Sequence, residues 1–386
     1  MTALEGGTPR EIVATLPGGT SPEYLQACER AGMNRVRIHG EKTGPEMAAK
    51  LIRDCHLAGL KVSYDTNGKK PRVRRSEGMT QITEGLEKDN WVKVFHPGER
   101  MLLVDENREA NPEEKLFVAR LSCLPQVFTG NGEERLNFSD GEICCTVKQV
   151  TKEGQTTVGI EVEVDSVRPN IQGLFWKMGV ISPTTDIFSG DDPALVAADI
   201  RKLEKVKEAL GDDRPDQIAI SFVCTKGQME DAQAKLNNIW PGVPTLAKIE
   251  TVRGVDNIDE IVQVTDVEVA RGDLTEAVKA NGKYTLPGAE ARIIIAAKKA
   301  HREVIVATHV ADSLLNQARR RPLETGERLV RNERVAVCLE LPEVDAWMLA
   351  AETMVTGKNA QQVISATSQA IRVAERYWQM YGRPGN

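Results

Sequence analysis

A lysine and two acidic residues lie at the ends of two neighbouring apolar segments, and together these residue types can bind an anionic substrate. Lys248 and Glu250 are two residues apart, so both side chains point to the same side if their segment is a β-strand. Asp273 follows the next apolar segment, residues 266–270. Carboxylate oxygens are the ligands that Mg²⁺ prefers, and a fixed ammonium stabilises a phosphoryl group or an enolate. The same spacing also fits a structural salt bridge, so the rest of the chain must decide.

Short apolar segments and amphipathic segments alternate along the chain. The apolar segments are four to six residues long and rich in β-forming residues, as expected for buried strands. This alternation predicts an α/β fold, the (β/α)₈ TIM barrel. The predicted strands are residues 12–16, 35–39, 60–64, 217–222, 245–249, 267–270, 303–308 and 346–350, and the predicted helices are 21–31, 45–58, 193–210, 227–239, 288–300 and 326–339, with 359–381 as the closing helix.

The alternation is interrupted once, after the third predicted strand. Residues 76–180 contain short alternating segments such as 101–104, 144–150 and 157–164, separated by turns rich in glycine, asparagine and proline. We therefore expect a small β-barrel domain inserted into the TIM barrel. Residues 1–75 would form the first part of the barrel, and residues 181–386 the remainder with the closing helix.

The composition restricts the class of protein. A length of 386 residues suits a barrel of about 250 residues that carries an insertion. The net charge of −6 without a basic block argues against nucleic acid as a partner, and no apolar run approaches the roughly 18 residues that span a bilayer. The seven cysteines form no CxxC pair and no zinc-binding spacing, and no secretory signal opens the chain. We expect a cytoplasmic enzyme with reduced thiols.

Active sites of such barrels lie at the carboxyl ends of the strands, so the residues there are the candidate site. An arginine and a lysine can hold a phosphoryl group, while Glu250 and Asp273 can hold a metal ion. The hydroxyl of Thr308 could orient a water molecule or pass a proton. In chain order the predicted strand ends carry Arg37, Asp65, Ser221, Lys248, Glu250, Asp273, Thr308 and Glu352.

Several of these segments resemble the motifs of pyruvate kinase. The most specific are Ala247-Lys-Ile-Glu250 and Val269-Ala-Arg-Gly-Asp-Leu274. The resemblance covers about residues 10 to 380. It also includes Asp65-Thr-Asn-Gly68 with Arg72, and the Val306-Ala-Thr308 and Ala351-Glu-Thr353 segments. Within the insert, Asn137-Phe-Ser-Asp-Gly-Glu-Ile143 is similar to a turn of the family's mobile lid. It implies a kinase that transfers a phosphoryl group between phosphoenolpyruvate and ADP, giving pyruvate and ATP, under a lid formed by the insert.

The resemblance also implies a role for each matched residue. Lys248 would stabilise the transferring phosphoryl group and the enolate, and Thr308 would lie near the enolate carbon. Glu250 and Asp273 would bind Mg²⁺ or Mn²⁺. Arg37 and Arg72 would contact phosphates. Gly272 and Asp273, in the 271–273 backbone, would contact the substrate carboxylate.

The chain departs from the family at the monovalent-cation site and at the nucleotide side. Lys70 stands where K⁺-dependent members have glutamate, and His39 stands where they have an asparagine, so an ammonium would replace K⁺ and we expect K⁺ independence. The family's Ser-Gly-Glu-Thr loop reads Ala350-Ala-Glu-Thr353 here. The chain stops after the closing helix, so we expect no allosteric control of the usual kind and a homo-oligomer formed through barrel surfaces.

Two other functions stay open, because the segments expected to bind the nucleotide differ from the family's motifs more than the segments expected to bind the metal ion. A barrel that holds a metal-bound pyruvate enolate could serve as a lyase, an aldolase or an enolpyruvate-transfer enzyme. His39 or His309 would then be the added acid or base, although either could be an ordinary polar residue of the barrel rim. A non-catalytic regulator that binds phosphoenolpyruvate or pyruvate would not need Lys248, Glu250, Asp273 and Thr308 together. Kinase activity is therefore the first hypothesis.

Overall fold

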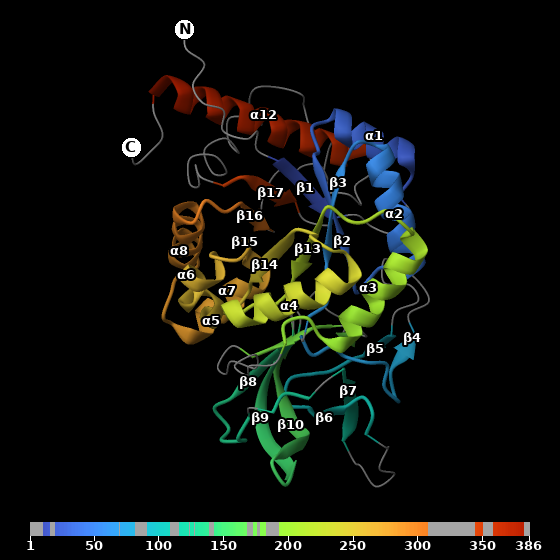
Figure 1. Ribbon diagram of the computed structural model, residues 1–386. Coiled ribbons are helices and arrows are strands. Elements are labelled where there is room, and N and C mark those ends of the chain that lie inside the picture. Colours follow the sequence, from blue (N-terminus) through green and yellow to red (C-terminus); the bar gives the residue numbers. More distant parts are fainter. Residues whose placement is uncertain are drawn as a thin grey trace. The chain divides into compact units, whose positions relative to one another are not determined.

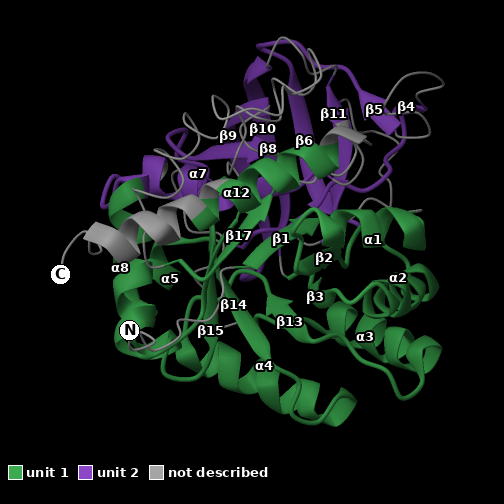
Figure 2. Ribbon diagram, turned by 90° about the horizontal axis from the view of Figure 1, so that it is seen from above, with its two compact units in different colours: residues 1–68, 193–272, 287–386 green, residues 69–192, 273–286 purple. Residues whose placement is uncertain are grey.

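The structure is a computed structural model of the 386-residue chain. It describes residues 11–15, 20–68, 70–81, 91–108, 116–122, 124–126, 128–138, 143–167, 173–175, 178–182, 193–307, 344–349 and 358–381. By its internal contacts the chain divides into two compact units (Figure 2). Unit 1 comprises Met1–Gly68, Pro193–Gly272 and Pro287–Asn386, and unit 2 comprises Lys69–Asp192 and Asp273–Leu286.

Unit 1 is built on a closed barrel of parallel strands, which confirms the predicted (β/α)₈ barrel (Figure 1). The order around the barrel is β1-β17-β16-β15-β14-β13-β3-β2, and β17 pairs with β1 to close it. All eight predicted strands are present. Their bounds are β1 Glu11–Thr15, β2 Arg35–His39, β3 Lys61–Asp65, β13 Gln217–Ile220, β14 Thr245–Ile249, β15 Asp266–Ala270, β16 Val304–Ala307 and β17 Ala346–Leu349.

The helices between the strands cover the outside of the barrel, because each carries one apolar face. The main ones are α1 Pro22–Arg30, α2 Pro45–Leu57, α3 Ala197–Leu210, α4 Lys226–Ile239, α8 Leu286–Lys299 and α12 Lys358–Tyr381. In α2, for example, Ala48, Leu51, Ile52 and Cys55 recur at helical spacing and are fully buried. The predicted helix 326–339 lies outside the described residues. Within the described parts, no helix has the length and apolar character required to cross a bilayer.

Three helices were not predicted, and one predicted strand ends two residues early. These helices are α5 Val252–Asp256, α6 Ile258–Ile261 and α7 Arg271–Asn281. The first two are about one turn long, which is too short for a helical periodicity to be recognised in the sequence. The strand predicted over residues 217–222 ends at Ile220. It ends there because Phe222 has a φ of 56°, which is a left-handed conformation that a strand does not accommodate.

The chain leaves unit 1 at Gly68 and returns to it at Pro193, and Asp199 ties these two places together. Asp199 lies in the first turn of α3 and is buried. Its two carboxylate oxygens accept hydrogen bonds from the backbone N–H groups of Asn67 and Gly68, both at 3.0 Å. The exit and the re-entry of the inserted segment are thus bonded to each other within unit 1.

Unit 2 contains two sheets around a core of its own. The larger sheet has the order β12-β8-β9-β10-β6-β7 and the smaller one the order β11-β5-β4. Buried Phe128, Phe138, Met101 and Leu136 belong to its core. The strands are β4 Thr80–Gln81, β5 Trp91–Lys93, β6 Arg100–Asp105, β7 Phe117–Leu121, β8 Arg135–Phe138, β9 Ile143–Glu153, β10 Thr156–Val167, β11 Leu174–Phe175 and β12 Val180–Ile181. The lid role of this segment stays a prediction.

Candidate active site

A buried charged cluster lies at the carboxyl ends of four neighbouring barrel strands. Arg37 belongs to β2, Asp65 to β3 and Lys248 to β14, while Ser221 directly follows β13 and Glu250 directly follows β14. Parallel strands present their carboxyl ends at one rim, so residues as far apart in sequence as Asp65 and Lys248 meet there. The structure therefore brings together five of the residues that the sequence analysis selected.

Lys248 is the centre of this cluster. Its Nζ lies 3.0 Å from Glu250 Oε1, 3.1 Å from Ser221 Oγ and 3.3 Å from Asp65 Oδ1, and the residue is only 6% exposed. Burial alone would lower the pKa of the ammonium, but the charges of Asp65 and Glu250 outweigh this effect and raise the pKa above its usual value. Lys248 therefore remains a fixed positive charge.

Asp65 connects Lys248 to Arg37. The Nε of Arg37 donates to Asp65 Oδ2 at 2.9 Å, and Nη2 of the same guanidinium contacts the same oxygen. Burial would raise the pKa of Asp65, yet Arg37 and Lys248 hold that pKa well below its usual range. A third bond, from Arg37 Nη1 to Thr15 Oγ1 at 3.3 Å, fixes the guanidinium to β1. Asp65 thus orients both cations of the cluster.

Glu250 is held by a strained backbone segment next to Ser221. Its Oε2 accepts a hydrogen bond from the backbone N–H of Phe222 at 2.7 Å. Phe222 is buried and has the positive φ noted above, a conformation that costs of order 1–3 kcal/mol for a residue with a side chain. Such strain is typical of functional sites, where a side chain must be presented in one position.

Glu268 was missed by the sequence analysis, although it belongs to the same barrel interior. It lies in the middle of β15, is 2% exposed, and within the described parts of the chain its buried Oε2 has no hydrogen-bond partner. Burial raises the pKa of this carboxyl to about 7, because the attraction of Lys248 and Arg37 compensates only in part. The rule of searching strand ends excluded it. A glutamate inside an apolar strand was the signal that could have found it.

Four other predicted residues lie inside unit 2 or next to it in the sequence. Gly272 is the last residue of the second segment of unit 1, and Asp273 is the first of the second segment of unit 2. Within unit 2, Lys70 Nζ lies 2.6 Å from Asp273 Oδ1, and its side chain is 9% exposed. Gly179 leaves the room for this lysine, since a Cβ there would lie 2.4 Å from Lys70 Cε. The backbone N–H of Arg72 donates to Ser122 Oγ at 3.0 Å.

Of the remaining predicted residues, the structure describes only His39, which lies next to the cluster. His39 is the register partner of Asp65 across β2 and β3, and its charge helps to lower the pKa of Asp65 after the larger effects of burial, Arg37 and Lys248. Thr308, His309 and Glu352 lie outside the described residues.

Glu250 is the carboxylate of unit 1 that could hold a metal ion, and Asp273, which belongs to unit 2, stays the predicted second ligand. The described residues contain no group of three or more His, Cys, Asp or Glu side chains arranged to hold a metal by themselves. Glu250 is buried at the rim of the barrel, and Asp273 follows the end of β15 by three residues. Hard oxygen donors of this kind fit Mg²⁺ or Mn²⁺, and Mg²⁺ commonly takes one or two carboxylates with substrate oxygens completing its shell.

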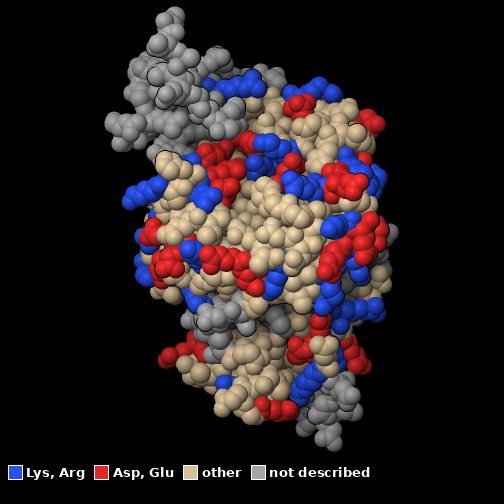
Figure 3. Space-filling view, viewed as in Figure 1, with Lys and Arg blue, Asp and Glu red and all other residues tan. Residues whose placement is uncertain are grey.

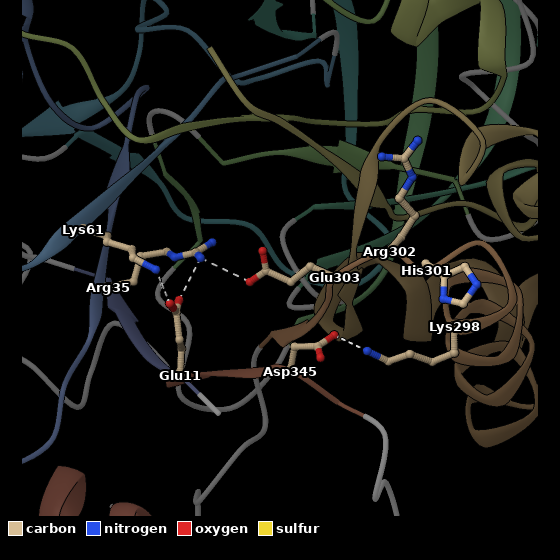
Figure 4. Close-up of a pocket in the computed structure, with 8 residues that line it drawn as sticks. All are labelled: Glu11, Arg35, Lys61, Lys298, His301, Arg302, Glu303 and Asp345. Carbon is tan, nitrogen blue, oxygen red and sulfur yellow. Dashed lines mark hydrogen bonds and ion pairs between the residues drawn. The ribbon is translucent and has the colours of Figure 1, made fainter. Parts of the chain in front are cut away.

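A charged hollow of about 440 Å³ lies at the opposite, amino ends of the barrel strands (Figure 4). Arg35 Nη2 lies 2.7 Å from Glu11 Oε2 and 3.2 Å from Glu303 Oε1, and Lys61 Nζ lies 2.6 Å from Glu11 Oε1. These ion pairs join the beginnings of β1, β2 and β3 to one another and to the residue before β16. Residues at this end of a barrel serve stability, so we assign the hollow no part in the chemistry.

The face drawn in Figure 3 has no broad area of positive charge among its described residues. There Lys and Arg side chains are interspersed with Asp and Glu side chains, in keeping with the net charge of −6. An anionic ligand that approached this face would meet local rather than broad positive charge.

The comparisons with known proteins agree with this geometry. The family model described as pyruvate kinase, barrel domain, matches residues 8–363. The chain is 27% identical to "Pyruvate kinase" of Mycobacterium intracellulare over 373 residues, covering 95% of this chain and 70% of that protein. It is 28% identical to "Pyruvate kinase" of Corynebacterium glutamicum and 26% identical to that of Thermotoga maritima, covering 95% of this chain and 69% and 71% of theirs. The chain belongs to the pyruvate kinase family.

Proposed function

We propose that the protein transfers a phosphoryl group between phosphoenolpyruvate and a nucleoside diphosphate, with a divalent metal ion. The observation that carries this proposal is the buried Lys248 ammonium, kept positive by Asp65 and Glu250 at the rim of the barrel. A fixed cation in a site of low dielectric stabilises the charge that moves through the phosphoryl group and onto the enolate oxygen. The names of the relatives, all pyruvate kinases, support the same substrate class.

Each residue then has a task that follows from its charge and its neighbours. Lys248 stabilises the enolate oxygen that forms when the phosphoryl group leaves, because its ammonium cannot easily lose a proton. Arg37 contacts the phosphate with guanidinium N–H groups and is oriented by Asp65. Arg72 would be a second phosphate contact, and Gly272 with its neighbours would hold the substrate carboxylate. Thr308 would lie near the enolate carbon.

Glu250 and Asp273 would hold the metal ion. When bound, Mg²⁺ or Mn²⁺ would neutralise part of the charge of the substrate oxygens. The hydrogen bond from the Phe222 N–H leaves Glu250 oriented before any ion arrives.

The test is ³¹P NMR of phosphoenolpyruvate with purified protein, ADP and Mg²⁺. We expect the phosphoenolpyruvate signal to disappear and the signals of ATP to grow. Untouched phosphoenolpyruvate in the presence of ADP would refute the kinase assignment. Pyruvate incubated with aldehydes or 2-oxo diacids would then test the alternative, enolate chemistry without a nucleotide.

We also propose that the reaction does not need K⁺, because Lys70 supplies a positive charge beside Asp273. The 2.6 Å contact between Lys70 Nζ and Asp273 Oδ1 supports this proposal. Turnover should be the same in tetramethylammonium and in K⁺ buffers, and the Lys70→Glu variant should become dependent on K⁺. Gly179→Ala separates the position of the ammonium from its charge, because its Cβ would displace the flexible Lys70 side chain without changing any charge. A wild-type enzyme strongly stimulated by K⁺ would contradict the proposal.

A further inference from the structure

Glu268 points into the barrel interior beside Lys248. In the parallel pairing of β14 with β15, Glu268 is the register partner of Lys248, and across β16 it is the partner of Ile305. Side chains of directly paired residues stand on the same side of a sheet. Ile305 belongs to the cluster that fills the barrel, with Leu246 and Met348 among its members. Glu268 therefore lies on the inner wall, at the level from which Lys248 extends toward the rim.

The environment of Glu268 is unusual for a carboxyl group. It is almost completely buried, and its Oε2 lacks a hydrogen-bond partner among the residues that the structure describes. An ionised carboxylate without hydrogen bonds is costly to bury, and a neutral carboxylic acid is much less so. A buried acid with a vacant oxygen next to the proposed reacting centre is available to exchange a proton with a ligand.

The charges around Glu268 decide its protonation state. Lys248 and Arg37 attract the ionised form, while Asp65 and Glu250 repel it, and these four groups together carry no net charge when all are ionised. Burial therefore prevails and raises the pKa of Glu268 to about 7. By contrast, the pKa of Lys248 is raised and that of Asp65 is lowered, so neither donates a proton readily near neutral pH.

We propose that Glu268 is the proton donor that converts the enolate of pyruvate into pyruvate, an inference that rests on the proposed function. The enolate left after phosphoryl transfer must gain one proton at its terminal carbon. The C–H bond forms with the proton of the Glu268 carboxylic acid, the enolate C–O⁻ becomes a ketone, and Glu268 is left as a carboxylate. In the reverse direction this carboxylate removes a methyl proton of pyruvate. The carboxylate regains its proton from water after product release.

The test separates proton transfer from phosphoryl transfer. Exchange of the pyruvate methyl protons for deuterium in D₂O is followed by ¹H NMR with Mg²⁺ and ATP, while ATP formation from phosphoenolpyruvate is followed in a single turnover. For Glu268→Gln we expect exchange to fall by about 100- to 10,000-fold, and ATP formation in the single turnover to fall much less. Glu268→Asp keeps the acid and should recover part of the exchange. Glu303→Gln, at the opposite end of the barrel, is the matched control and should exchange like the wild type.

A second readout does not depend on turnover. The metal-free wild-type protein at neutral pH should show the infrared carbonyl band of a buried, protonated carboxylic acid, and this band should be missing from Glu268→Gln. The glutamine has the same shape and is neutral, so the variant should keep the barrel fold, which circular dichroism checks.

Two results would overturn the inference, and they differ in what they leave standing. If Glu268→Gln exchanges protons as fast as the wild type while both form ATP, the proton comes from another group, such as Thr308, and the proposed function survives. If the wild type neither forms ATP nor exchanges the pyruvate protons, the proposed function and this inference fail together.

Discussion

Replacing Lys248 by methionine should reduce the stability of the barrel as well as abolish turnover. The cluster contains two cations, Arg37 and Lys248, and two ionised carboxylates, Asp65 and Glu250, so its charge is balanced. Methionine fills a similar volume but carries no charge. The variant therefore leaves one buried negative charge without compensation.

The size of the effect follows from the burial of this ion network. Removing one partner of a buried ion pair costs about 3–5 kcal/mol, because the remaining charge loses its compensation but not its burial. Lys248 has three oxygen contacts within 3.3 Å and is 6% exposed, so it belongs to this class rather than to the surface salt bridges. In a barrel of this size such a loss lowers Tm by roughly 10 °C.

Differential scanning calorimetry and a turnover assay on the same samples provide the measurement. The double variant Lys248→Met/Glu250→Gln restores the charge balance, so it should recover most of the lost Tm and none of the turnover. Arg35→Met removes a buried cation from the opposite end of the barrel, and we expect it to lower Tm while turnover persists. A Lys248→Met protein as stable as the wild type, or one that still turns over, would refute the reasoning.

Two further predictions concern Glu268 and Gly68. The pKa of Glu268 is about 7 in the folded protein against 4.5 as its ordinary value, so the unfolded chain releases this proton first as the pH rises. The free energy of unfolding of the wild type should therefore decrease by about 3 kcal/mol between pH 4.5 and 7, relative to that of Glu268→Gln. The measurement is Tm against pH for both proteins in the presence of a chelator. Parallel curves would contradict the prediction. Gly68→Ala should lower the free energy of unfolding by about 1–3 kcal/mol, because φ is +65° and the new Cβ would lie 2.8 Å from Ser221 Cβ. It should also reduce kcat, because the hydroxyl of Ser221 accepts a hydrogen bond from Lys248. Gly59→Ala, at a φ of +78° but in open space, is the control, and equal loss of Tm and kcat in both variants would exclude the steric explanation.

The barrel strands were predictable because strands buried inside a barrel leave short segments rich in apolar and β-branched residues in the sequence. The rule that active sites lie at the carboxyl ends of the strands located Asp65, Ser221, Lys248 and Glu250, which lie in the last two residues of a strand or directly after it, and Arg37, which lies in the middle of β2. It could not give the pairing of Lys248 with Asp65, because contacts across 183 residues depend on strand order and register.

Other features were hidden for physical reasons that the sequence does not express locally. The left-handed Phe222, which shortens β13, is stabilised by the hydrogen bond to Glu250 and not by any turn-forming residue. Glu268 lies inside a strand rather than at its end. The contact of Lys70 with Asp273 joins two separate segments of unit 2, so the sequence indicated an ammonium but not its partner.

The bonds from Asp199 to the Asn67 and Gly68 amides have a consequence for how this architecture can diversify. They join the two points between which residues 69–192 are inserted, so the barrel itself holds the ends of the insert together. Once the ends of a loop are fixed, doubling its length adds only about 0.6 kcal/mol of closure entropy. The barrel can therefore tolerate an insert of almost any length at this junction. Natural variation or design can exchange the whole inserted module there while the strand order of the barrel stays unchanged.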